Sequence, residues 1–132
     1  MIFINRRELK WGSKIGRLLE EWKPKKDIKD DCLTLRWGDI KFYKSVLEAS
    51  SVFYPEETLV KDRSLKEVLL TGTISAKQYG TITNGIIEAI GDPTGHLELP
   101  NLSSYNWMHD GLEVSANYLT NTVTLKIIIR KQ

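Results

Sequence analysis

LEVSANYLTNTVTLKIII, residues 112–129, predicts a β-hairpin and with it a protein rich in antiparallel strands. Apolar residues at every second position indicate a strand with one buried face. Two such runs flank Leu119-Thr120-Asn121, which we expect to form the turn. The alternating apolar positions are Leu112, Val114, Ala116 and Tyr118, then Val123, Leu125, Ile127 and Ile129.

The segment before this hairpin, residues 79–99, also favours strands. Four isoleucines in residues 82–90 fit helical spacing as well, but glycine and threonine at neighbouring positions are poor helix formers. Asn84-Gly85 between two β-rich runs is a strong signal for a tight hairpin turn. We therefore expect a hairpin over residues 79–90, a turn at 92–95 and a strand at 96–99.

The N-terminal half contains the helix signals. Residues 15–22 have one apolar stripe, with Ser13 as a possible cap and Pro24 as the stop. The alternation over residues 33–37 predicts a strand, and the spacing over 40–47 predicts a helix that Asp39 caps. Residues 64–69 match a capping box and predict a short helix or turn.

Together these elements predict a single α+β domain, residues 1–132. Its antiparallel sheet, richest in hairpins in the C-terminal half, is expected to be covered on one face by two or three helices from the N-terminal half. The sequence leaves open whether this sheet is closed into a barrel, because strand order is not encoded in periodicity.

Composition indicates an ordinary globular protein. The chain is 41% hydrophobic and 27% charged, with a net charge of +2, which does not single out a nucleic-acid or membrane protein. No apolar run approaches the roughly 20 residues that span a bilayer, and the N-terminal residues lack the order of a signal peptide. Cys32 is the only cysteine, so no internal disulfide forms, and we expect a cytoplasmic protein.

Motifs for chemistry are sparse. Cys32 is expected to be a small packed strand residue, and no spacing of ligands or glycines indicates a metal or a cofactor. We therefore predict no catalytic, cofactor-binding or metal site. The enzymatic alternative is a small nuclease, independent of metal, that uses His96 and His109, although His96 is expected to point outward from its strand and His109 to lie in a turn.

Aromatic residues outside the apolar stripes are the best candidates for binding a partner. Trp22 and Trp37 are in phase with buried positions, whereas Trp11, Tyr105 and Trp107 fall in segments expected to be irregular. Acidic residues are a second set of candidates, because carboxylates can face a basic partner. This set comprises Asp30, Asp31, Glu56 and Glu57.

LTLRWGDIKFYKSVL, residues 33–47, resembles the strand-to-helix segment of some bacterial immunity proteins of contact-dependent growth inhibition. The features that match are the alternating leucines, the Asp-Ile-Lys helix start and the Tyr-Lys pair. The resemblance implies a small cytoplasmic inhibitor that binds a cognate toxin domain, without enzymatic activity of its own. The chain is less acidic than is common in such proteins, which favours a toxin with an acidic surface.

A nucleic-acid-binding module is the alternative from another class. Residues 68–130 offer about five β segments, roughly the order of an OB-type barrel. Its groove would use two tyrosines and two basic residues, a small number for such a surface. These residues are Tyr79, Tyr118, Lys126 and Arg130.

Overall fold

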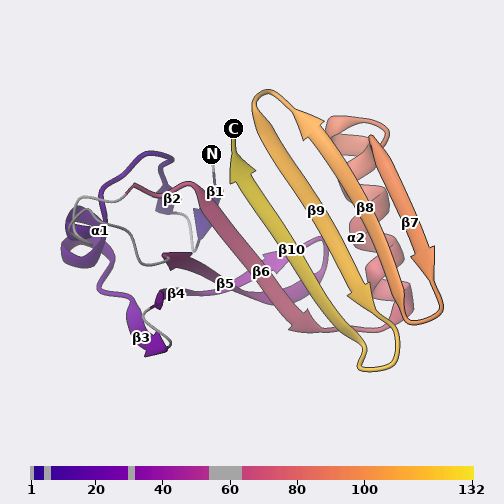
Figure 1. The fold of residues 1–132 in the computed structure, drawn as a ribbon, viewed down its shortest axis with the longest axis horizontal. Coiled ribbons are helices and arrows are strands. Elements are labelled where there is room, and N and C mark those ends of the chain that lie inside the picture. The colour runs from indigo at the N-terminus through magenta and orange to yellow at the C-terminus, as the bar shows by residue number, and fades with distance from the viewer. Residues whose placement is uncertain (1, 5–6, 30–31, 54–63) are drawn as a thin grey trace.

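The computed structural model describes residues 2–4, 7–29, 32–53 and 64–132, and has an α+β fold dominated by antiparallel strands (Figure 1). A two-stranded sheet consists of β1 (Ile2–Ile4) and β2 (Arg7–Leu9). An eight-stranded sheet has the order β3-β4-β5-β6-β10-β9-β8-β7. Its strands are β3 (Lys25–Lys29), β4 (Cys32–Phe42), β5 (Ser45–Phe53), β6 (Glu67–Thr73), β7 (Gly95–Leu99), β8 (Leu102–His109), β9 (Leu112–Leu119) and β10 (Thr124–Lys131). The helices are α1 (Ile15–Trp22) and α2 (Ala76–Ile90).

The large sheet consists of two meanders, β3 to β6 and β7 to β10, and α2 connects them in sequence. After β6 the chain runs through α2 to the far edge of the sheet and returns strand by strand until β10 pairs with β6. The described strands form an open sheet, with β3 and β7 at its two edges. This order differs from the closed OB-type barrel considered above.

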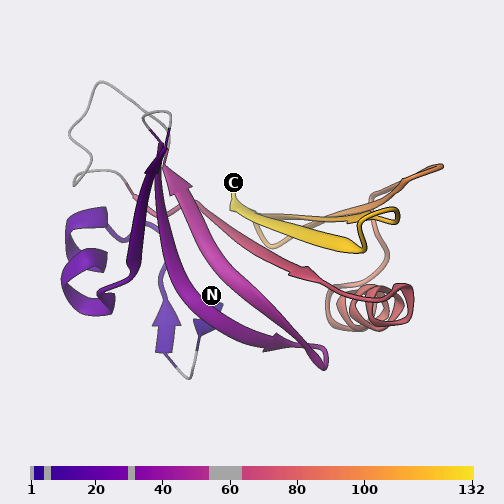
Figure 2. The ribbon, with the colours of Figure 1, turned by 90° about the horizontal axis from the view of Figure 1, so that it is seen from below.

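One face of the sheet, here called the inner face, forms the core. Ala49, Leu70, Ile127, Ala116 and Tyr105 lie in register across five neighbouring strands on this face. Figure 2 shows α2 lying under the C-terminal meander, β7 to β10. Apolar side chains from α1 and from α2 join one buried cluster with the inner face. The opposite face is called the outer face below.

The segment 79–90 is a helix, so the predicted hairpin is wrong. Ser75 caps α2 with a complete capping box, in which its hydroxyl accepts from the Gln78 N–H and the Gln78 side chain accepts from the Ser75 N–H. Ile82 and Ile86 are buried at helical spacing. Gly85 forms no turn: a Cβ at this position would collide with the Tyr43 ring at the tip of the β4–β5 hairpin. Because residue 85 has no side chain, the tip of the hairpin can pack closely on α2.

Residues 40–47 form strand rather than the predicted helix. Trp37 occupies a β-bulge, because Arg36 pairs with Ser50 and Gly38 with Ala49. The bulge changes the alternation, so Trp37 and Ile40, three residues apart, both belong to the inner face. Two members of the predicted helical stripe, Ile40 and Leu47, instead pair across β4 and β5, and the exposed Val46 points to the other face. Tyr43 and Lys44 then make the turn to β5 with positive φ angles of 44° and 71°.

The helical cover also differs from the prediction. In the described part of the N-terminal half α1 is the only helix, because residues 67–73 form β6 and residues 39–50 form parts of β4 and β5 with the turn between them. The second helix, α2, lies in the half that was expected to hold strands alone. Lys14, not Ser13, is the N-cap of α1, but the predicted stripe is correct, with Ile15 and Leu18 buried. Neither described helix is long and apolar enough to cross a membrane.

Candidate binding surface

Trp107, predicted to lie on the surface, is instead a core residue. It belongs to β8 and is only 1% exposed on the inner face. Its indole Nε1 donates to the carbonyl oxygen of Gly91, 3.2 Å away, at the C-terminal end of α2. Burial and this bond hold the helix end against the sheet, so Trp107 does not contribute to a binding surface.

The other predicted contacts are only partly available. Tyr105 is half-buried on β8 and is covered by the ring of His96, with 4.1 Å between the ring centroids. Trp11 is half-buried between β2 and α1 and packs against the core. The acidic candidates Asp30, Asp31, Glu56 and Glu57 lie outside the described residues.

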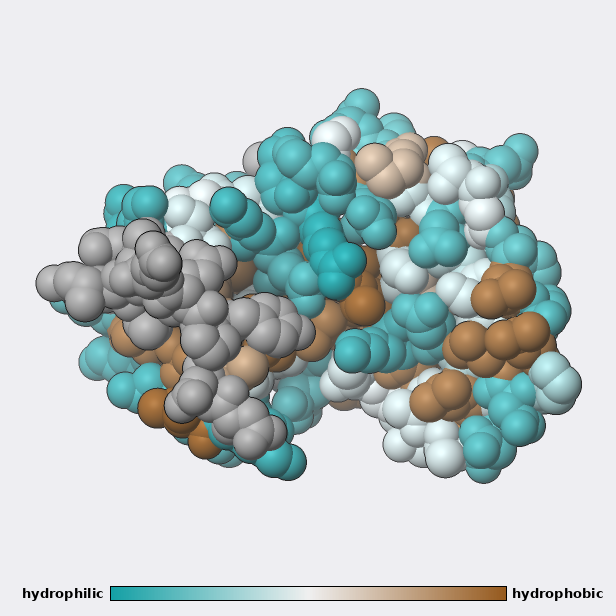
Figure 3. Space-filling model, viewed as in Figure 1, coloured by the Kyte–Doolittle hydropathy of each residue, from teal (hydrophilic) through white to brown (hydrophobic). Residues whose placement is uncertain are grey.

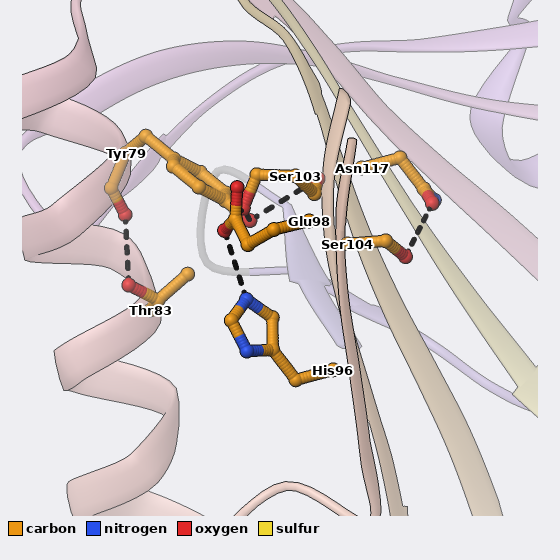
Figure 4. Close-up of polar contacts among 7 residues, drawn as sticks. All are labelled: Tyr79, Thr83, His96, Glu98, Ser103, Ser104 and Asn117. Atoms are coloured by element: carbon orange, nitrogen blue, oxygen red, sulfur yellow. Dashed lines mark hydrogen bonds and ion pairs between the residues drawn. The ribbon is translucent and has the colours of Figure 1, made fainter. Parts of the chain in front are cut away.

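A polar cluster lies on the inner face where β7 and β8 meet α2 (Figure 4). His96 Nε2 and Ser103 Oγ both contact the same oxygen of Glu98, at 2.8 and 2.6 Å. The Tyr79 hydroxyl lies 3.1 Å from Ser103 Oγ. The hydrogen bonds from Ser103 and then His96 lower the pKa of Glu98, whereas burial raises the pKa of Tyr79.

The order of hydrogen bonds in this cluster does not suit nucleophilic catalysis. A serine nucleophile needs a base that accepts its proton, usually a histidine. Here Ser103 donates to Glu98, and a carboxylate with a lowered pKa is a weak base. His109 lies four residues along β8 from Tyr105, the partner of His96, which places it about 13 Å away along the strand. The geometry therefore supports a structural network that ties β7 to β8 and α2.

His96 also points to the opposite face from the one predicted. Since His96 pairs with Tyr105, it lies on the inner face, and Leu97 and Leu99 lie on the outer face. Both faces of β7 are accessible to solvent because this edge strand extends beyond the buried core. Figure 2 shows β7 reaching past α2 at the end of the molecule.

The outer face carries an aligned apolar row at one end of the C-terminal meander. Leu99 pairs with Leu102, and Leu102 pairs with Leu119, so three leucines lie side by side on β7, β8 and β9. We call these three residues the leucine row. Leu99 and Leu119 are 51% and 43% exposed, and Val123 in the following turn is also exposed. Figure 3 shows this hydrophobic surface over the lower ends of these strands.

A cleft of about 440 Å³ lies at the other end of the sheet, beside α1 and β4. Its walls include Trp22 and Trp37, which contact edge to face with ring centroids 5.7 Å apart. Arg36 in this cleft contacts Asp27 at 2.9 Å and Glu48 at 3.1 Å. These carboxylates neutralise the guanidinium, but Lys23 and Lys25 also line the cleft, so it carries charges of both signs.

Three of the four residues expected for a nucleic-acid groove are engaged elsewhere, whereas Lys126 is exposed. Tyr79 and Tyr118 are buried and stack on each other between α2 and the sheet, with centroids 4.7 Å apart. Arg130 contacts Glu67 at 2.7 Å. These tyrosines present no free ring face on which a base could stack. Within the described residues, no group of three or more His, Cys, Asp or Glu side chains could hold a metal ion.

Residues 33–47, which resemble a strand-to-helix segment in sequence, fold as the β4–β5 hairpin. The sequence likeness therefore has no counterpart in the local fold. No protein-family model, curated protein or solved structure matched the chain.

Sequence reasoning missed the leucine row. The signal that could have revealed it is the alternation of Leu97 and Leu99 with His96 and Glu98. Leu102 follows three residues after Leu99. With His96 expected to point outward, Leu97 and Leu99 would face the core, so they were not expected on the surface. Their true face depends on how β7 pairs with β8, which the sequence does not state.

Proposed function

We propose that the protein is a non-enzymatic binding protein that docks on a toxin domain through the leucine row and inhibits it. The observation that carries the docking surface is the alignment of three leucines across three neighbouring strands on the outer face. Single exposed leucines are common on protein surfaces, whereas a contiguous apolar patch is typical of an interaction site.

The energetics favour a partner that covers this row. Leu99 and Leu119 each leave about half of the side chain in water. Burying that half against a partner contributes about 1 kcal/mol per residue, from the 1.5–3 kcal/mol of a fully buried leucine. The fold does not need these side chains to be apolar, because the core is on the other face of the sheet.

The charge of the C-terminal half also bears on the partner. Residues 67–132 contain four basic and six acidic side chains, a net charge of −2 with neutral histidines. The +2 of the whole chain hides this local balance, because the first 66 residues are basic. An acidic half that carries an apolar row suits a partner with a basic rim around an apolar patch, as on a nuclease toxin. This replaces the acidic toxin surface expected from the whole-chain charge.

The toxin domain as the class of partner rests only on the sequence likeness of residues 33–47 to immunity proteins, whose helix half is strand in this fold. The docking surface is supported independently by the leucine row. The two parts of the proposal therefore require separate tests.

The docking surface is tested by capture from a lysate of the source cells after nuclease treatment. Wild type is compared with Leu99→Asp/Leu119→Asp and with the control Val46→Asp, which changes an exposed apolar residue on β5. Wild type and control should retain the same protein in near-equal amounts. The double variant should bind it roughly 30-fold more weakly, because about 2 kcal/mol of apolar burial is lost. Retention by the double variant at the wild-type level would contradict the proposed surface.

Inhibition is tested by expressing the captured protein's catalytic domain in host cells. Its expression should stop growth, and co-expression of the wild-type chain or Val46→Asp should restore growth. The double leucine variant should fail to protect. A captured domain that is harmless on its own would refute the toxin assignment while leaving the docking surface intact.

A further inference from the structure

The two edges of the large sheet differ in how they oppose pairing with another strand. β3, at one edge, carries Lys25, Lys26 and Lys29, all exposed. Lysines on an edge strand discourage addition of another strand, because they place like charges opposite each other and keep the strand solvated. The outward edge of β3 is thus protected against self-pairing.

β7, at the other edge, lacks this protection. Its residues, Gly95-His96-Leu97-Glu98-Leu99, include no lysine, arginine or proline. Among the described strands only β8 pairs with it, so the backbone groups on its other side have no strand partner. Figure 1 shows β7 at the margin of the molecule. The backbone chemistry of this edge is complementary to one more antiparallel or parallel strand.

We infer that the β7 edge pairs antiparallel with the β7 edge of a second copy of this chain, with Leu97 opposite Leu97 on the two-fold axis. In this register His96 lies opposite the second copy's Glu98, and Glu98 lies opposite the second copy's His96. Each edge thereby supplies one member of each of the two cross-strand pairs. Each imidazole would lie opposite a carboxylate that can accept a hydrogen bond from its N–H, so the edge is complementary to itself.

The side chains involved are already held in place. The imidazole of His96 stacks on Tyr105 and already contacts Glu98 of its own chain at 2.8 Å, and that carboxylate accepts from Ser103. Since both lie on the inner face, they would meet their counterparts there, while Leu97 and its counterpart would meet on the outer face. Less side-chain entropy is lost when such groups are ordered before association.

This self-association is separate from the docking proposed above. It uses the edge of β7, whereas the leucine row lies on the outer face and extends to β9. Pairing would join the two sheets into one continuous sheet, with both outer faces on the same side. Both leucine rows would remain accessible. A five-residue strand pair is a small interface, so the dimer should be weak.

The register is tested by cysteine cross-linking in a Cys32→Ser background, which removes the only native cysteine. Opposed Cα atoms in antiparallel strands lie about 4.5–5.5 Å apart, within the range of a disulfide. Leu97→Cys should therefore form a disulfide-linked dimer under mild oxidation. Leu99→Cys is the matched control, since Leu97 and Leu99 are 49% and 51% exposed on the same face. Its two copies would lie about 13 Å apart along the strands and should not cross-link.

The charge pairs are tested by sedimentation at about 10–200 µM, which brackets the affinity of a small interface. His96→Glu places like charges opposite each other and should weaken the dimer about tenfold or more. His96→Glu/Glu98→His restores two imidazole–carboxylate pairs in the same register and should restore the dimer. Far-ultraviolet circular dichroism checks that each variant is folded.

The proposal is overturned if wild type stays monomeric throughout this range, if Leu99→Cys cross-links as fast as Leu97→Cys, or if the exchanged pair fails to restore a dimer that His96→Glu weakens. None of these results depends on toxin binding. Failure of this dimer is thus distinguishable from failure of the proposed function.

Discussion

Gly80 and Gly85 lie in the same helix, α2, yet alanine at the two positions should change stability in opposite directions. A Cβ at Gly80 would meet no described atom within 4 Å. A Cβ at Gly85 would collide with three ring atoms of Tyr43. The comparison tests whether the tip of the β4–β5 hairpin packs on α2 as described.

The expected magnitudes follow from helix propensity and packing. Alanine is favoured over glycine by about 1 kcal/mol in a helix interior, so Gly80→Ala should raise the free energy of unfolding by about that amount. Gly85→Ala has the same intrinsic gain, but the collision includes Cγ of Tyr43, so the whole ring must move. Overpacking of this kind costs about 1–3 kcal/mol. The net result should be a loss of about 1 kcal/mol.

Denaturant unfolding and thermal melting both measure this difference. A change of 1 kcal/mol corresponds to about 4 °C in Tm for a chain of this size. In a Tyr43→Ser background the collision is absent, so Gly85→Ala should stabilise the protein as much as Gly80→Ala does. Equal stabilisation by both alanines in the presence of Tyr43 would refute the packing of the hairpin on α2.

Two further predictions concern the inner face. Trp107→Phe should lower the free energy of unfolding by about 1–3 kcal/mol in denaturant titrations, because Gly91 loses its indole donor and the buried site loses volume; an unchanged midpoint would contradict the buried position. Glu98→Gln should flatten the acid limb of a stability–pH curve relative to wild type. The pKa of Glu98 is lowered in the folded state, so its stabilising effect is present above the unfolded pKa and is lost as pH falls through the folded pKa; parallel acid limbs would contradict this.

The sequence predicts the C-terminal hairpin and α1 correctly because local pattern and tertiary environment agree there, except that Val123, expected in the second strand, is exposed in the turn. In β9 and β10 the alternating positions are the ones that face α2, and Ala116, Tyr118, Leu125 and Ile127 are all buried. In α1 the stripe begins at Ile15 and the helix ends before Pro24. Each element has one buried face, so periodicity alone identifies it.

The failure at residues 79–90 has a tertiary cause. Glycine and threonine lower helix propensity, but Ser75 and Gln78 cap the start, and burial of Tyr79, Ile82 and Ile86 stabilises the helix. Gly85 is required by a contact with Tyr43, which is 42 residues away in sequence. Propensity describes the isolated helix, whereas the contact that explains this glycine is not local.

The candidate site was the less predictable part. Tyr105 and Trp107, expected in an irregular segment, alternate with Ser104 and Asn106, which is the pattern of the strand that they form. The leucine row depends on the pairing of β7 with β8 and of β8 with β9. Three residues from separate strands become neighbours only through strand register, so their surface is visible in the structure alone.

The pairing of β6 with β10 has a consequence for synthesis of the chain. About 50 residues separate Thr73, at the end of β6, from its partner Thr124. At about 5–20 residues per second, β6 emerges from the ribosome roughly 3–10 s before its partner strand is made. During that interval the apolar residues of β6, such as Val68 and Leu70, have an unpaired edge beside them. A nascent chain that stalls between α2 and β9 would therefore expose an apolar, unpaired strand to chaperones and proteases. Slow codons in that region should lower the yield of folded protein.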